Sequence, residues 1–213
     1  MKDIPMFDTE TGVSSLILKE IPYKQIAYVK VQSVQPGGLE AHLRECVSFC
    51  RMCGAERVFA AGHAELDHWP LYCTVITMAL GLSRSMALGA NLFPVTEETV
   101  SKWREIYNDR MGAVDNTATL TARDERELLE GGAYFVHEAG ELLGIGWMKG
   151  SELLCIAAVK RGEGERVLKT LLTLADCDRV TLDVASTNAR ARRLYDRMGF
   201  VPVEEKVKWY QIL

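Results

Sequence analysis

The chain has 213 residues, enough for one large domain or for one domain with a smaller partner, and its 48% hydrophobic content is ample for a packed core. The 29 acidic and 25 basic side chains give a formal charge of −4, so no overall positive field attracts nucleic acid or an anionic membrane. No apolar core of a signal peptide opens the sequence, and no run approaches the roughly 18 apolar residues that span a bilayer. We therefore expect a globular cytoplasmic protein that binds neither nucleic acid nor membrane.

Three of the six cysteines, Cys46, Cys50 and Cys53, reproduce the C-x3-C-x2-C spacing that holds an iron-sulfur cluster in radical enzymes. The same residues continue a helical stripe that begins with Leu39 and Leu43. Because cysteine packs as a small hydrophobe, a core helix explains the stripe without a metal. Three other residues could be zinc ligands, His63, His68 and Cys73, but their spacing is not that of a known zinc site. We predict no metal and reduced thiols.

Periodicity and turn residues predict two strand–helix pairs in the first part of the chain. In order, they are a strand over 25–34, a helix over 39–53, a strand over 56–62 and a helix over 70–81. Pro70 and Gly81 are typical of the two ends of that second helix. The segment 83–95 carries loop signals, so we expect two domains, an α/β unit over 1–84 and a second domain over 85–213.

The second part of the chain alternates helices and strands. A helix is expected after Thr96, with Val100, Trp103 and Tyr107 on one face, and a short helix over 122–130 follows. The later elements are a hairpin over 133–148, a strand over 152–159, a helix over 167–175, a strand over 179–186, a helix over 188–200 and a strand over 207–213. This order predicts an α/β or α+β fold, with a mixed central sheet flanked by helices.

A glycine-containing loop in the stretch AAVKRGEGERVL, residues 157–168, joins an apolar strand to a helix. Such a loop presents free backbone N–H groups at the positive end of the helix dipole, which suits an anion. It lacks the Lys-Ser/Thr pair of a Walker loop and the complete G-x-G-x-x-G of a dinucleotide site. Taken alone, the loop is equally compatible with an ordinary strand-to-helix turn.

The loop residues Arg161-Gly162-Glu163-Gly164 are followed downstream by NARARRLYDRMGF, residues 188–200. Together with the order of elements over 85–213, these motifs resemble the GNAT family of N-acetyltransferases. The resemblance implies a GNAT fold and transfer of an acetyl group from acetyl-CoA to an amine of a small molecule or protein.

The resemblance also implies a role for each matched position. The CoA pyrophosphate is expected on the loop, whose residues are Arg161, Gly162, Glu163, Gly164, Glu165 and Arg166. The pantetheine arm is expected along the central strand at Cys155, Ile156 and Ala158, with Asn188 and Arg192 as further CoA-binding residues. Tyr195 corresponds to the general acid that protonates the CoA thiolate. Glu152 is the first candidate for the base, and His137 and Asp183 are the alternatives.

The sequence departs from the family pattern at Arg166, where a Gly or Ala is usual. An arginine there must either swing aside or contact the phosphate itself. Glu163 and Glu165 also bring negative charge to the proposed anion site. A non-catalytic CoA-binding or protein-interaction module that keeps the fold is therefore the alternative function.

The first part of the chain resembles the second when the two are overlaid. Arg57-Val58 matches Arg179-Val180, and Leu71-Tyr72 matches Leu194-Tyr195. We interpret residues 1–84 as a degenerate half-GNAT repeat, with chance similarity between two short α/β units as the alternative. The oligomeric state stays open, and a homodimer is one alternative.

Overall fold

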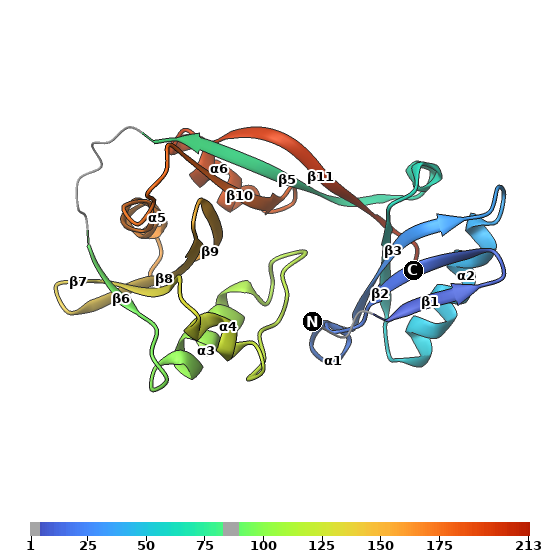
Figure 1. The fold of residues 1–213 in the computed structure, drawn as a ribbon, viewed down its shortest axis with the longest axis horizontal. Coiled ribbons are helices and arrows are strands. Elements are labelled where there is room, and N and C mark those ends of the chain that lie inside the picture. The colour runs from blue at the N-terminus through green and yellow to red at the C-terminus, as the bar shows by residue number, and fades with distance from the viewer. Residues whose placement is uncertain (1–4, 83–89) are drawn as a thin grey trace. The chain divides into compact units, whose positions relative to one another are not determined.

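The computed structural model describes residues 5–82 and 90–213 (Figure 1). The chain divides into two compact units, of which one runs up to Val75 and includes Glu205–Leu213, and the other is Ile76–Glu204. Strands β5 (Leu71–Gly81) and β11 (Val201–Gln211) therefore contribute residues to both units. The boundary expected near residue 84 falls outside the described residues.

The first unit is a sheet with helices packed against it (Figure 1). Its strands lie in the order β1-β2-β3-β4, followed by the end of β11, and only the β3–β4 pair is parallel. The strand bounds are β1 Met6–Thr9, β2 Gly12–Ile17, β3 Ile26–Val34 and β4 Arg57–Ala61. The helices are α1 Ile21–Lys24, α2 Leu39–Met52 and the 3-10 helix η1 Ala64–His68.

Helix α2 carries the cysteine stripe. Cys46 and Cys50 are fully buried in the core of this unit, beside Leu39 and Leu43. Burial raises the pKa of Cys46 to about 11 and that of Cys50 to about 12, so both are neutral thiols near pH 7. The core stripe is confirmed for these residues and wrong for Cys53, which is exposed because the helix ends at Met52. Across 5–82 and 90–213, no group of three or more potential metal ligands is found.

The second unit is a mixed sheet covered by helices on both faces. Its strand order is β5-β10-β9-β8-β7-β6, and β9 and β10 are parallel. The strands are β6 Asn91–Pro94, β7 Ala133–Glu138, β8 Glu141–Lys149, β9 Glu152–Ala158 and β10 Arg179–Ala185. The helices are α3 Val100–Met111, α4 Glu125–Leu129, α5 Gly164–Leu172 and α6 Ala189–Arg197. The predicted mixed α/β architecture is confirmed.

Two hydrophobic clusters on opposite faces of this sheet hold the helices. On one face, Leu168 and Leu171 of α5 pack with Tyr195 of α6. On the other, Trp103 of α3 packs with Trp147 of β8. Because side chains alternate along a strand, the two clusters identify the face to which each strand residue points.

The structure corrects one element and adds five. Residues 71–81 form strand β5 and not the predicted helix. Pro70 and Gly81 do mark its ends, but the run Thr74–Thr77 consists of β-branched residues, which favour a strand. The short strands β1, β2 and β6 and the helical segments α1 and η1 were not predicted. The rest of segment 83–95 is partly outside the described residues.

Of the two residue pairs that match between the units in sequence, one pair occupies equivalent places in the structure and the other does not. Arg57-Val58 begins β4 and Arg179-Val180 begins β10, so these pairs occupy equivalent places. The second pairing is wrong, because Leu71-Tyr72 lies in a strand and Leu194-Tyr195 lies in helix α6. Both units contain the order strand, helix, strand, helical segment, strand, and the interpretation as a degenerate repeat stays a prediction.

Candidate functional site

Strands β9 and β10 separate shortly after they begin. They pair only at Glu152 with Thr181 and at Leu153 with Leu182, although both strands continue beyond these residues. On the other edge of β9, the register with β8 shifts so that Leu154 is an extra residue, a β-bulge. The bulge therefore lies where the two parallel strands part. Beyond this point the edge of β9 that faces β10 is unpaired.

The alternation of backbone groups shows which residues face the open edge. The N–H of Val159 donates to the carbonyl of Leu143 on β8, at 2.8 Å. Since neighbouring residues point their backbone groups in opposite directions, Ala157 also faces β8, whereas Ile156 and Ala158 face the gap toward β10. An extended ligand with amide groups could pair with Ile156 and Ala158 as an additional strand does. The backbone of Cys155 faces β8, and its side chain is buried.

The loop after β9 leads into the uncapped N-terminus of α5. Gly162 has a φ of 98°, which favours glycine, and Glu163 stands at the N-cap without a side-chain cap. The N–H groups of the first turn, Gly164–Arg166, therefore face outward at the positive end of the helix dipole. Helix α6 differs, because the Asn188 side-chain oxygen accepts a hydrogen bond from the N–H of Ala191 at 3.1 Å. The α5 terminus is thus a cradle for an anion.

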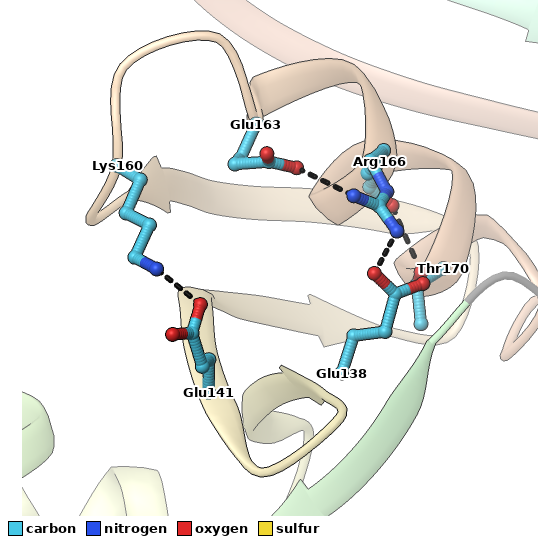
Figure 2. A network of polar contacts seen from close by, with 6 residues as sticks. All are labelled: Glu138, Glu141, Lys160, Glu163, Arg166 and Thr170. Atoms are coloured by element: carbon cyan, nitrogen blue, oxygen red, sulfur yellow. Dashed lines mark hydrogen bonds and ion pairs between the residues drawn. The ribbon is translucent and has the colours of Figure 1, made fainter.

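Two basic side chains of this segment, Lys160 and Arg166, are held by carboxylates, as Figure 2 shows. Arg166 swings aside and pairs with Glu138 at the end of β7 and with Glu163, at 3.3 Å. Lys160 pairs with Glu141 at the start of β8, and this contact lowers the pKa of Glu141. The guanidinium of Arg166 is therefore occupied by two carboxylates.

Tyr195 lies on the buried face of α6. Its ring packs on Phe200, with centroids 5.6 Å apart, and Cys155 of β9 is an electrostatic neighbour. Burial, followed by the influence of Cys155, raises the pKa of the phenol well above its usual value, so the side chain is neutral near pH 7. In the part of the chain that the structure describes, no hydrogen bond of the Tyr195 hydroxyl is found. The phenol thus keeps its proton near pH 7 and has Cys155 of β9 as a neighbour.

Two further predicted residues shape the turn before α6. The side-chain oxygen of Asn188 is engaged as the helix cap, which leaves its amide hydrogens as donors. Arg192 donates from Nη1 to the carbonyl of Ser186, at 3.5 Å. Both residues therefore fix the segment between β10 and α6.

The sheet face away from α5 and α6 carries two of the three candidate bases. Leu182 of β10 points into the α5 cluster, so Asp183 points to the opposite face. Glu152 pairs laterally with Thr181 and shares that face, because laterally paired residues point the same way. Both carboxylates are exposed. The structure therefore brings Glu152 and Asp183 together at the start of the separation between the strands.

The side chain of Asp183 is oriented by a neighbour on β5. Thr77 donates from its hydroxyl to Oδ1 of Asp183, at 2.7 Å. The third candidate, His137, lies on β7 with strand β8 between it and β9, and its ring packs edge-on against Phe93 at 5.3 Å. His137 is therefore not part of this group.

The corresponding strands of the first unit do not part. Strands β3 and β4 remain paired from Ile26 with Arg57 to Lys30 with Ala61. No open strand edge of the kind on β9 exists between them. The chain thus offers one such site among its described residues, in the second unit.

The sequence itself matches no protein-family model and no curated protein. Solved structures do match. A GCN5-related N-acetyltransferase from Sphaerobacter thermophilus has a TM-score of 0.60 at 15% identity, covering 94% of this chain and 75% of that one. An enzyme of the same description from Kribbella flavida has a TM-score of 0.56 at 13% identity, covering 97% and 88%. The chain has the GNAT fold.

A third match is described as a functionally unknown conserved protein of Staphylococcus epidermidis, with a TM-score of 0.59 at 11% identity over 99% of this chain and 94% of that one. The three matched structures cover 94% to 99% of this chain, so the matches include residues of both units. As for membrane segments, the helices in the described ranges are too short or too polar to cross a bilayer.

Proposed function

We propose that the chain is an acyl-CoA-dependent N-acyltransferase that acetylates a cationic primary amine of a small molecule or protein. The observation that carries this proposal is the open edge of β9 beside the uncapped N-terminus of α5, with a buried tyrosine behind it. A free strand edge, an anion cradle and a proton donor are what a pantetheine amide, a pyrophosphate and a departing thiolate require.

Acetyl-CoA would bind mainly through the backbone. The N–H groups of Gly164–Arg166, with that of Gly162 in the preceding loop, would hold the pyrophosphate at the helix terminus. The backbone groups of Ile156 and Ala158 would pair with the amides of the pantetheine arm, while Cys155 contributes only packing. Asn188 would donate its side-chain amide to the arm, Arg192 would keep the turn before α6 in place, and Arg161 is an exposed cation of the loop.

The proposed acid, Tyr195, and the proposed base, Glu152, lie on opposite faces of the sheet, and each has one proton transfer in the reaction. The neutral amine nitrogen attacks the thioester carbonyl carbon, the new N–C bond forms, and the C–S bond breaks. Tyr195 gives its proton to the leaving thiolate and regains one from solvent. Glu152, as the general base, accepts through water the proton that the bound ammonium loses to become the neutral amine, and the second N–H proton passes to solvent as the amide forms.

The position of Asp183 indicates which class of amine the protein would accept. The carboxylate is exposed, oriented by Thr77, and next along β10 from the last residue paired with β9. A fixed carboxylate at this position would bind an ammonium group before it loses its proton. We therefore assign a cationic amine as the acceptor and Asp183 as the residue that binds it.

Release of CoA thiol tests the proposal. Purified protein is mixed with acetyl-CoA and a panel of mono- and diamines, amino acids and lysine peptides, and free thiol is followed with time. We expect release that depends on a cationic amine, and a higher melting temperature with acetyl-CoA alone.

The alternative function gives a different result in the same experiment. A non-catalytic CoA-binding module would show the rise in melting temperature without thiol release from any amine. A protein that shows neither effect would contradict both acyl-CoA functions.

A further inference from the structure

We propose that Glu138 and Glu141 set the affinity of the site for acyl-CoA, because they occupy the side chains of Arg166 and Lys160 that would otherwise bind the phosphates. This inference rests on the function proposed above. It concerns the tip of the β7–β8 hairpin, whose carboxylates lie against the loop that precedes α5 (Figure 2).

The geometry of the hairpin fixes the two carboxylates. Ala139 and Gly140 form the tight turn, with φ values of 50° and 82°. Positive φ at both central residues is typical of the type I′ turn, which matches the twist of the flanking strands. Glu138 and Glu141 are therefore paired directly across the hairpin, on either side of this turn.

Such a pair is unfavourable by itself. Like charges directly opposite each other destabilise a two-stranded ladder. Here each carboxylate has a basic partner, Glu138 with Arg166 in the first turn of α5 and Glu141 with Lys160 in the preceding loop. The two ion pairs thus offset the repulsion between Glu138 and Glu141, which indicates that the hairpin tip and the segment around the start of α5 stabilise each other.

The ion pairs are exposed and can exchange partners. The side chains of Arg166 and Glu138 retain 50% and 34% of their accessible surface, and exposed pairs of this kind contribute little to stability. The backbone of Arg166 is anchored separately, since its carbonyl accepts a hydrogen bond from the Thr170 hydroxyl at 2.8 Å. Only the guanidinium needs to rotate to exchange a carboxylate for a phosphate, which it binds in the same two-pronged manner.

The carboxylates therefore compete with the pyrophosphate for the same cations. Releasing one of these cations from its carboxylate makes one positive charge available to the phosphates, and one charge at a distance of several ångströms in solvent corresponds to about a threefold change in affinity. We expect Glu138→Gln to bind acetyl-CoA about threefold more tightly than the unmodified protein. The double variant with Glu141→Gln should bind about tenfold more tightly.

Calorimetric titration with acetyl-CoA at about 50 and about 200 mM salt measures these affinities. Arg166→Ala is expected to weaken binding, and Glu138→Gln should have no further effect in the Arg166→Ala background, because its partner is absent. Glu105→Gln is the matched control: it removes the same charge from an exposed pair with Lys102, at 3.3 Å on α3.

The outcomes separate this inference from the proposed function. Binding that Glu138→Gln leaves unchanged, weakens, or strengthens equally without Arg166 would overturn the inference and leave the acyl-CoA site standing. A protein that gives no heat with acetyl-CoA, in any variant, would remove the proposed function and this inference with it.

Discussion

Replacing Tyr195 with Phe is expected to lower kcat for acetyl transfer about 100-fold, the lower end of what a positioned proton donor contributes. The substitution removes only the hydroxyl and keeps the ring that packs on Phe200 in the core of the second unit. Because burial keeps the phenol protonated, the hydroxyl can donate to the thiolate throughout the neutral pH range. The rate is measured by thiol release under saturating acetyl-CoA.

The control for this prediction is Tyr23→Phe, the same change at an exposed tyrosine of the first unit, which should leave the rate unchanged. The melting temperature and the affinity for acetyl-CoA should be close to those of the unmodified protein in both variants. If Tyr195→Phe retains full turnover with a normal melting temperature, Tyr195 is a packing residue and not the acid.

Asp183→Asn is expected to raise KM for the amine about tenfold, because it removes the carboxylate that binds the ammonium and keeps the shape that Thr77 contacts. Its kcat at saturating amine should change little. Glu152→Gln should show the opposite division, with kcat lowered about tenfold or more and KM nearly unchanged, since it removes the proposed base. Steady-state kinetics over a range of amine concentrations measures both.

Acetyl-CoA affinity is the control for this pair of variants, because neither carboxylate belongs to the phosphate loop. Thr77→Val should reproduce part of the KM effect of Asp183→Asn by releasing the carboxylate from its hydrogen bond. Equal KM and kcat in Asp183→Asn and the unmodified protein would eliminate Asp183 as the acceptor ligand.

Much of the second unit could be predicted from local pattern. The hairpin, the apolar strand β9, helix α5 and helix α6 each have a periodicity that matches their environment, and glycine or asparagine marks their ends. Strand β5 differs from the helix that its end residues predict, because Pro70 and Gly81 are compatible with the ends of a strand as well as of a helix. The β-branched run between them favours the strand.

The features that make the site depend on contacts between distant residues. The bulge at Leu154 and the parting of β9 from β10 are properties of strand register, which no single segment encodes. The pairing of Arg166 with Glu138 likewise joins a helix to a hairpin tip, so the sequence could raise the question about Arg166 without answering it. The face shared by Glu152 and Asp183 became visible only with the pairing of Glu152 and Thr181.

Hydrogen exchange with and without acetyl-CoA tests the central claim most directly, because it reports where on the chain the ligand binds. We expect slower exchange at residues 156–158 on the open edge of β9 and at 162–167 in the cradle of α5. The equivalent loop of the first unit, around residues 35–40, should be unchanged because β3 and β4 remain paired. Protection confined to the first unit, or no protection in 156–167 at saturating acetyl-CoA, would contradict the account.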